Sequence, residues 1–325
     1  MFCAGTGPAE PLRPCRALLI LSLALALAGC NGTLPLARLA PFRVIGDWTG
    51  NQWRSIGPTL GGELDPASSN ICDSGQTACM SAILAEMSRR IAALGCSHLA
   101  PFATMYRQVS REIKASAEAR RYADPAYVVH LDAVFSTFYY HALDSWRAGR
   151  RDEVPQVWRI AFSAAGGRRV STLGDMLLGM NAHISRDLPY ALATVGLRYP
   201  DGLGATADVV AVNKDIERAT QPMLAQIRAA YDPSLGPPRD LPNWVHPSEV
   251  PKIIAQWRLE AIANARDLLD AHSVAARVEV ETRIDTTATL RSLLIWRATA
   301  YADPARDSAP RDAYCAAHLA RRSSE

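Results

Sequence analysis

Apolar residues recur at every third or fourth position along most of the chain, which is the spacing of one buried helix face. The pattern is clear from Met80 and Ile83 to Leu94, after which Gly95 provides a stop. The same spacing, with local start and stop signals, predicts further helices at residues 102–113, 125–146, 172–184, 187–195, 206–231, 248–269, 274–296 and 304–321.

Strands have little support in this pattern. Residues 276–282 alternate as a strand would, but the apolar spacing continues at helical intervals through Ile284 and Leu294. Breaks are predicted at residues 166–167, 199–202 and 232–251, where glycine and proline gather. The sequence therefore predicts one all-α, bundle-like domain over residues 60–325.

The first residues have the pattern of a targeting segment. Arg13 and Arg16 precede an apolar run that ends in Leu27-Ala28-Gly29-Cys30, which resembles the lipobox of bacterial lipoproteins. We therefore expect a signal peptide over residues 1–29, a lipid on Cys30 and an irregular tether over residues 30–59. The protein would be anchored in the membrane of the cell envelope by its lipid. Asparagine rather than aspartate after the cysteine favours the outer membrane.

Charge adds little to this picture. The 35 basic and 32 acidic residues are interspersed and give a net charge of +3, so no basic block forms a nucleic-acid footprint. The chain also lacks a G-x-S-x-G elbow, a P-loop and an H-E-x-x-H helix. These patterns exclude several common catalytic classes.

Cysteines beyond the leader and the lipid site are Cys72, Cys79, Cys96 and Cys315. An even number in an exported chain predicts two disulfides, and four cysteines allow three pairings. We favour Cys72–Cys79, which closes a short loop, and Cys96–Cys315, which ties an early helix to the C-terminal end. A zinc cluster is the alternative, but the spacings lack a C-x-x-C pair.

The most unusual stretch is GMNAHISRDLPYAL, residues 179–192, where polar residues interrupt an apolar sequence. His183 and Asp187 lie four apart, and therefore on one helix face. Pro189 cannot donate to the carbonyl of Ser185, so we expect the helix to kink or restart near Asp187. A buried pair of this kind must be neutralised, hydrogen-bonded or bound to a cation.

Other polar clusters lie on neighbouring predicted helices. His130 and Asp132 stand in an otherwise apolar segment, and His141 shares the face of His130. His98 follows a junction between two helices, and Asp208 begins a later one. Because both apolar helices must be buried, we expect the first pair to converge with the pair in residues 179–192, with His98 and Asp208 as further members.

Imidazoles and carboxylates from several helices are how metal sites are built into helical bundles. The first hypothesis is thus a metal-dependent hydrolase of phosphodiesters or other esters, with one or two divalent cations, for which the imidazole content favours zinc. Its metal ligands would be His130, Asp132, His183 and Asp187, and a metal-bound water would be the nucleophile. Asn181 and Arg186 are candidates for steadying the substrate. The alternative is a non-enzymatic binding or scaffolding lipoprotein with a structural His/Asp network.

Three stretches together resemble a known family: CSHLAPFATMYRQV, HLDAVFSTFYYHAL and LLGMNAHISRDLPYAL. They look like the landmarks of an uncharacterised bacterial family catalogued as domain of unknown function 5995. The resemblance covers most of the chain from Cys72 to Trp296 and implies no established activity. The positions that match its last landmark are Gly179, Asn181, Ala182, His183, Ile184, Asp187, Leu188 and Pro189.

A fainter resemblance concerns the spacing of His183, Asp187 and Pro189. It is similar to the histidine–aspartate helix of the zinc-dependent phospholipase C and single-strand nuclease superfamily, whose members are all-α and exported. This chain departs from that pattern because Leu192 or its neighbours stand where a second histidine is expected. A lipidated cysteine also replaces the free N-terminal tryptophan. The resemblance therefore implies one or two metals and not a trinuclear site.

Overall fold

Helices that follow one another through short connections make up this protein. The computed structural model describes residues 62–202, 204–235 and 249–324, and over these residues the only β-pairing is two isolated bridges. The predicted all-α fold is confirmed. The elements are α3 (Thr77–Leu94), α4 (Ala100–Glu118), α5 (Pro125–Arg147), the 3₁₀ turn η2 (Arg151–Glu153), α6 (Gln156–Gly166), α7 (Thr172–Asn181), the π-helical turn η3 (Ala182–Asp187), α8 (Leu188–Val195), α9 (Thr206–Ala230), α10 (Val250–Asp270), α11 (Val274–Thr299) and α12 (Pro304–Ser324).

The expectations for residues 1–59 concern a part of the chain outside the described residues. The signal peptide, the lipid on Cys30 and the tether therefore stay predictions. Among the helices that are described, none has the length and apolar character needed to span a bilayer.

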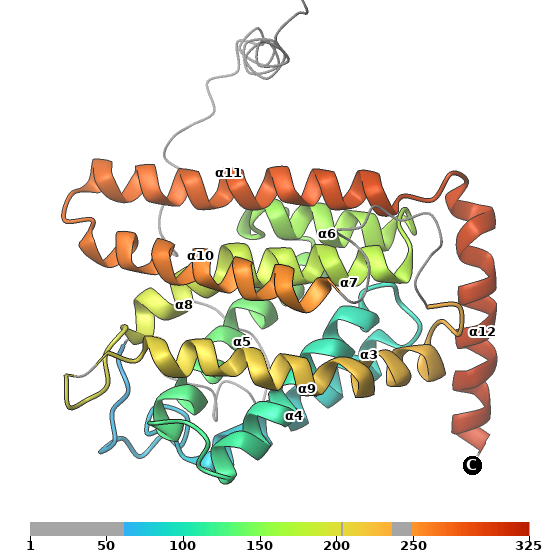
Figure 1. Cartoon of the computed structure of the whole chain (residues 1–325). Helices are drawn as coiled ribbons and strands as arrows, with labels where there is room; N and C mark the ends of the chain where they lie inside the picture. Colours follow the sequence, from blue (N-terminus) through green and yellow to red (C-terminus); the bar gives the residue numbers. More distant parts are fainter. Residues whose placement is uncertain (1–61, 203, 236–248, 325) are drawn as a thin grey trace, which may run out of the picture. The chain divides into compact units, whose positions relative to one another are not determined.

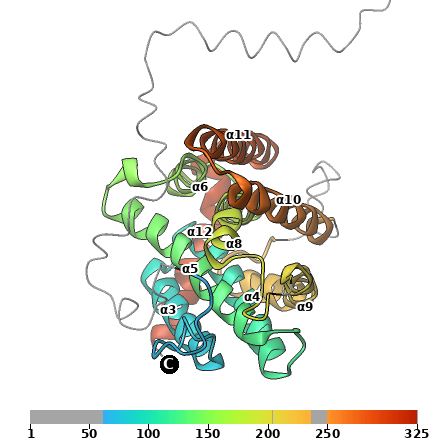
Figure 2. The same cartoon turned by 90° about the vertical axis from the view of Figure 1, so that its left-hand side faces the viewer.

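The stretch formed by α7, η3 and α8 is the centre of the fold. Every residue from 172 to 192 is buried, which is unusual because a helix on a domain surface buries only one stripe. Helices α4, α5, α6, α10 and α11 all pack against parts of it. Figure 2 shows α8 enclosed among these neighbours.

One close approach depends on a glycine. A Cβ at Gly179 would lie 2.5 Å from the ring of Phe102, so only glycine lets α4 bring this ring against α7. The contact brings the aromatic side chain of α4 into the middle of the core, next to the residues described below.

Helix α5 begins as predicted. The carboxylate of Asp124 accepts hydrogen bonds from the backbone N–H groups of Ala126 and Tyr127, and Pro125 occupies the first turn. Residues 276–282, the only strand candidate, lie within α11, as the longer apolar spacing indicates.

Helix α6 was not among the predicted helices. It is only 11 residues long, and Pro155 precedes it. Its inward side carries Val157, Trp158, Ala161 and Phe162, and it is held by packing against α7 and α11. A helix this short is marginal by itself, so tertiary packing decides its conformation.

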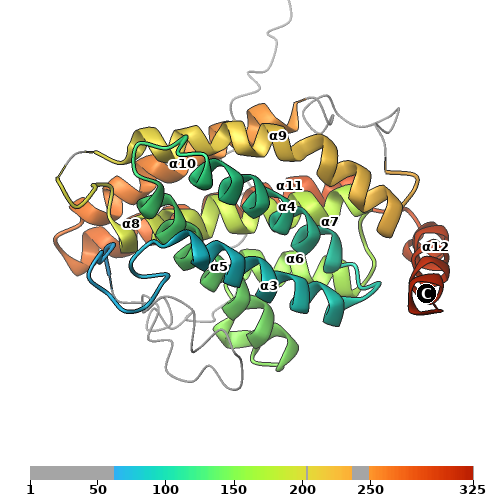
Figure 3. The ribbon, with the colours of Figure 1, turned by 90° about the horizontal axis from the view of Figure 1, so that it is seen from below.

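Both favoured disulfides are present. Cys72 pairs with Cys79 just before and within the first turn of α3. Cys96, in the turn between α3 and α4, pairs with Cys315 of α12 across 219 positions of sequence. Helix α12 runs crosswise to α9, α10 and α11 in Figure 1 and is seen end-on in Figure 3. The long-range disulfide therefore fastens this crosswise helix to the start of the domain.

We predict that the two disulfides stabilise the fold unequally. In the chain-entropy model a longer closed loop restricts the unfolded chain more, so losing Cys96–Cys315 should lower the free energy of unfolding by about 5 kcal/mol. Losing Cys72–Cys79 should lower it by roughly half as much. Urea unfolding of the two double Cys→Ala variants measures both values. Equal losses, or a larger loss from the short loop, would contradict the prediction.

Candidate functional site

The central helix changes its hydrogen-bonding pattern at the polar stretch. The α-helix gives way to a π-helical turn over Ala182–Asp187 and resumes at Leu188. Pro189 lacks the N–H that would bond the Ser185 carbonyl, and a π turn is one way for a helix to absorb such a loss. The predicted interruption near Asp187 is confirmed in this form. Turns of this kind are frequent at functional sites.

Asp187 is the most fully engaged carboxylate of this stretch. Its Oδ2 accepts from the indole Nε1 of Trp158 on α6 at 2.8 Å and lies 3.3 Å from Nδ1 of His183. Its Oδ1 accepts from Nη1 of Arg186 at 3.1 Å. The expected pairing of His183 with Asp187 on one helix face is therefore confirmed. A buried carboxylate with three donors is compensated for its loss of water.

His183 lies in an aromatic enclosure. Its ring stacks on Phe135 with centroids 3.5 Å apart and planes 6° apart, and the ring of Tyr106 lies 4.5 Å away. Burial lowers the pKa of His183, and the nearby Asp187 carboxylate opposes this effect only in part. The imidazole is therefore neutral. With Nδ1 donating to Asp187, Nε2 carries the lone pair, and it has no partner among the described residues.

A cavity of about 100 Å³ lies beside this imidazole. A single water needs only about 10–15 Å³, so a larger guest can enter. Side chains from α4, α5, α7, η3, α8, α9 and α10 form its wall, and almost all of them are apolar. Four methionines are among them: Met105, Met176, Met180 and Met223. Methionine is flexible and polarisable, which lets a wall adapt to different guests.

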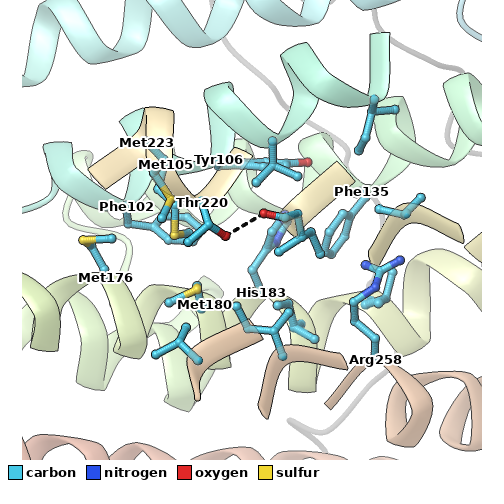
Figure 4. Close-up of a pocket in the computed structure, with 18 of the residues that line it drawn as sticks. Phe102, Met105, Tyr106, Phe135, Met176, Met180, His183, Thr220, Met223 and Arg258 are labelled. Atoms are coloured by element: carbon cyan, nitrogen blue, oxygen red, sulfur yellow. Dashed lines mark hydrogen bonds between the residues drawn. The ribbon is translucent and has the colours of Figure 1, made fainter. Parts of the chain in front are cut away.

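The cavity has two chemically different ends. Figure 4 shows Met176 and neighbouring methionines at one end and Arg258 at the other, with His183 between them. Four of the lining residues are half-buried: Val109, Ile216, Thr220 and Val250, which belong to α4, α9 and α10. The side of the cavity formed by these helices is therefore its more exposed side.

Asp132 is the one acid that lines the cavity. Its side chain comes from α5, and its Oδ2 has no hydrogen-bond partner among the described residues. Burial raises the pKa of Asp132 to about 7, although the Ser110 hydroxyl and the Arg258 cation favour the ionised form. The carboxyl is therefore divided between its neutral and ionised forms near neutral pH.

Arg258 was missed by the sequence analysis. It lies on α10, only 5% exposed, and burial lowers its pKa to about 10. A signal did exist: Arg258 stands four positions after Ile254 and four before Ile262, on the apolar face of its helix. A charge on that face is unusual enough to mark a site.

The four expected metal ligands do not all meet at this cavity. Asp132 and His183 line it, whereas His130 and Asp187 do not. His130 is buried elsewhere, with Nδ1 2.9 Å from the carbonyl oxygen of Cys72 and Nε2 3.1 Å from that of Gly62. Both ring nitrogens thus face acceptors, and neither presents a lone pair to a cation. The expectation that the two His/Asp pairs converge on one cavity is corrected accordingly.

The two expected substrate-steadying residues also face away from the cavity. The Asn181 amide donates to the carbonyl of Ala288 at 2.7 Å and to the hydroxyl of Ser292 at 2.9 Å, both on α11. Arg186 contacts Asp187, approaches Asp285 at 3.4 Å, and lies over the ring of Tyr190. Both side chains fix the position of the central helix against its neighbours.

The weaker candidates lie apart from the cavity as well. His98 bridges Asp175 on α7 and Asp312 on α12, at 3.0 Å from each, and so supports the docking of α12. Asp208 accepts from the backbone N–H groups of residues 123 and 124 and from the hydroxyl of Tyr199, each at 2.8 Å. His141 is half-buried on α5 and does not line the cavity.

In the described ranges, no group of three or more His, Cys, Asp or Glu side chains is arranged to hold a metal ion. The histidines and aspartates that the sequence singled out instead divide into two sets. Most are hydrogen-bonded within the fold, and only Asp132 and His183 border the cavity.

We predict that Asp132→Asn changes the pH dependence of stability. The folded protein holds the Asp132 proton up to about pH 7, whereas the ordinary pKa of this side chain is 3.8. The wild-type protein should therefore lose stability from this group as pH rises from about 4 to about 7, and the asparagine variant should not. The free energy of unfolding of the variant should exceed that of the wild type by a few kcal/mol at about pH 8 and by little at about pH 4.

Urea unfolding at a series of pH values measures this difference. Asp175, whose pKa burial raises to about 6, is present in both proteins and cancels in the comparison. Unfolding free energies that stay parallel across the whole series would show that Asp132 is ionised throughout and refute the prediction.

The cavity and its central helix lie in the part of the chain that a known family covers. The model of the Family of unknown function (DUF5995) matches residues 80–298, which include every helix from α4 to α10 and most of α3 and α11. Neither the curated proteins nor the solved structures contain a match to this chain. On the family match, which spans well over half of its length, the chain belongs to the Family of unknown function (DUF5995).

Proposed function

We propose that this protein is a non-enzymatic binding protein of the bacterial cell envelope that holds an apolar ligand in the cavity of its helical domain. The observation that carries the proposal is the cavity itself. Its apolar wall, its few polar groups and its position between helices of a bundle are the features of sites for small molecules.

The energetic cost of the cavity supports a role in binding. If water does not fill it, an apolar cavity costs about 24 cal/mol for each Å³, so about 100 Å³ corresponds to roughly 2 kcal/mol. This is a large share of the 5–15 kcal/mol that typically separates folded from unfolded states. A ligand that fills the space recovers the lost contacts, and binding would stabilise the fold.

The hydrolase hypothesis has less support from the geometry. Of its four ligands only Asp132 and His183 reach the cavity, and the Arg258 cation lines the same wall, where it would repel a divalent metal ion. The similarity to zinc-dependent phospholipases rests on the spacing of residues 183–189 alone. The carboxylate of Asp187 already accepts hydrogen bonds from Trp158, His183 and Arg186. Zinc binding and hydrolysis therefore stay hypotheses from the sequence.

The envelope location rests on the lipobox-like sequence that ends in Cys30. We expect Cys30→Ser to abolish incorporation of labelled palmitate, because no lipid would be attached. The amount of protein in the membrane fraction should fall for the same reason. Metabolic labelling and fractionation measure both. Unchanged labelling of the serine variant would contradict the anchor and would leave the cavity proposal intact.

Binding itself is tested with a neutral fluorescent naphthalene probe, which emits strongly only in an apolar site. The wild-type protein should bind the probe and gain thermal stability from it. Val212→Trp should abolish binding, because Val212 lines the cavity from α9 and is 5% exposed, so the larger side chain takes up the space.

The matched control lies two positions away on the same helix. Val210 is 39% exposed and does not line the cavity, so Val210→Trp should leave probe binding unchanged. Circular dichroism should show that both variants fold. The proposal fails if the wild type does not bind the probe, or if both tryptophan variants bind it equally well.

A further inference from the structure

We propose that the ligand is an amphiphile with a carboxylate head, of the fatty-acid class, and that Arg258 binds this head inside the cavity. The inference rests on the proposed function, because it assigns the chemistry of the ligand in the same cavity. It starts from the unusual situation of one buried arginine.

Four arginines are buried among the described residues, and three of them contact a carboxylate. Arg90 pairs with Asp144 at 2.6 Å, Arg186 with Asp187 at 3.1 Å and Arg311 with Asp312 at 3.1 Å. Arg258 has no such ion pair within the described ranges. An uncompensated buried charge is strongly unfavourable. In the described core, the Arg258 guanidinium is therefore the buried cation that an added anion would stabilise.

The guanidinium of Arg258 is held in place but has free donor capacity. Its Nη2 donates to the carbonyl of Val209 on α9 at 2.7 Å, and this bond links α10 to α9. Its Nε has no partner among the described residues. A guanidinium carries five N–H donors in a planar fork that matches the two oxygens of a carboxylate.

The nearby acids do not supply this anion. Asp132 and Asp215 act on Arg258 only at longer range. Asp215 is already engaged by the hydroxyls of Ser116 and Tyr122 and by Arg218. Asp132 lines the same cavity, and burial favours its neutral form. When Asp132 is ionised, it repels a doubly charged phosphate more strongly than a singly charged carboxylate, so a monoanionic head is preferred.

The shape of the cavity indicates what is attached to the head. The methionine end lies away from Arg258 in Figure 4, and the wall between them is apolar and aromatic. A molecule with its carboxylate at Arg258 would place a hydrocarbon tail along this wall toward Met176. The desolvation of the guanidinium has already taken place on folding, so the head meets a pre-organised partner.

Calorimetric titration of the purified full chain with octanoate and with octanol tests the inference, because the two ligands share a tail and differ in the head. Octanoate should bind wild-type protein at least about tenfold more tightly than octanol. Arg258→Met keeps the length of the side chain and removes its charge, and it should abolish this preference while octanol binding persists. At about pH 8, where Asp132 is ionised, Asp132→Asn should strengthen octanoate binding, because it removes a competing negative charge.

Arg266→Met on the same helix is the control, since Arg266 is exposed, and it should keep the wild-type preference. The neutral probe used above shows whether the cavity of each variant is still formed. If the wild type binds the probe but takes octanol as tightly as octanoate, or if Arg258→Met retains the preference, the carboxylate assignment is wrong and the binding function stands. If the wild type binds neither the probe nor octanoate, both the proposed function and the carboxylate assignment are wrong.

Discussion

The carboxylate of Asp187 is the interaction on which the rest of the core depends. It is 1% exposed and joins α6 to η3, because Trp158 of α6 and the η3 residues His183 and Arg186 all direct donors to it. Leaving such a charge without these partners would cost several kcal/mol. His183, Arg186 and Asp187 all lie in the π-helical turn. In this arrangement Asn181 faces α11 and His183 faces the cavity.

Buried polar groups in this protein therefore have two roles. His98, Asn181 and Asp208 are hydrogen-bonded to other elements of the fold, and each helps to position a helix. At the cavity, Nε2 of His183, Oδ2 of Asp132 and Nε of Arg258 have no partner among the described residues. A ligand in the cavity would supply partners for these three groups, which supports the proposed binding function.

Much of the fold could be predicted from the sequence because its signals are local. Helical spacing and the proline at residue 189 act within one or two turns. The pairing favoured for the four cysteines, one of the three that they allow, is the pairing in the structure. The pairing of His183 with Asp187 is local as well. Helix α6 was missed because it is short and held by packing against distant helices.

The cavity could not be predicted, because its wall comes from seven elements spread over residues 102–258. The partners of His130 show the same limitation: they are backbone carbonyls of residues 62 and 72, which no residue pattern marks. Two apolar helices with His/Asp pairs must be buried, but burial alone does not decide which of their faces meet. Arg258 had a local signal in its apolar surroundings, yet only the structure places it in the same cavity wall as Asp132.

The central claim is that an apolar, ligand-sized space lies beside His183. A crystal of the protein under xenon pressure tests it most directly, because xenon binds apolar cavities and is located by its anomalous scattering. The account predicts a xenon peak between Phe135, Met180 and Ile184, within the wall described above. Side chains collapsed into this space, or a chain of ordered waters bonded to Asp132 and Arg258 with no xenon, would contradict it.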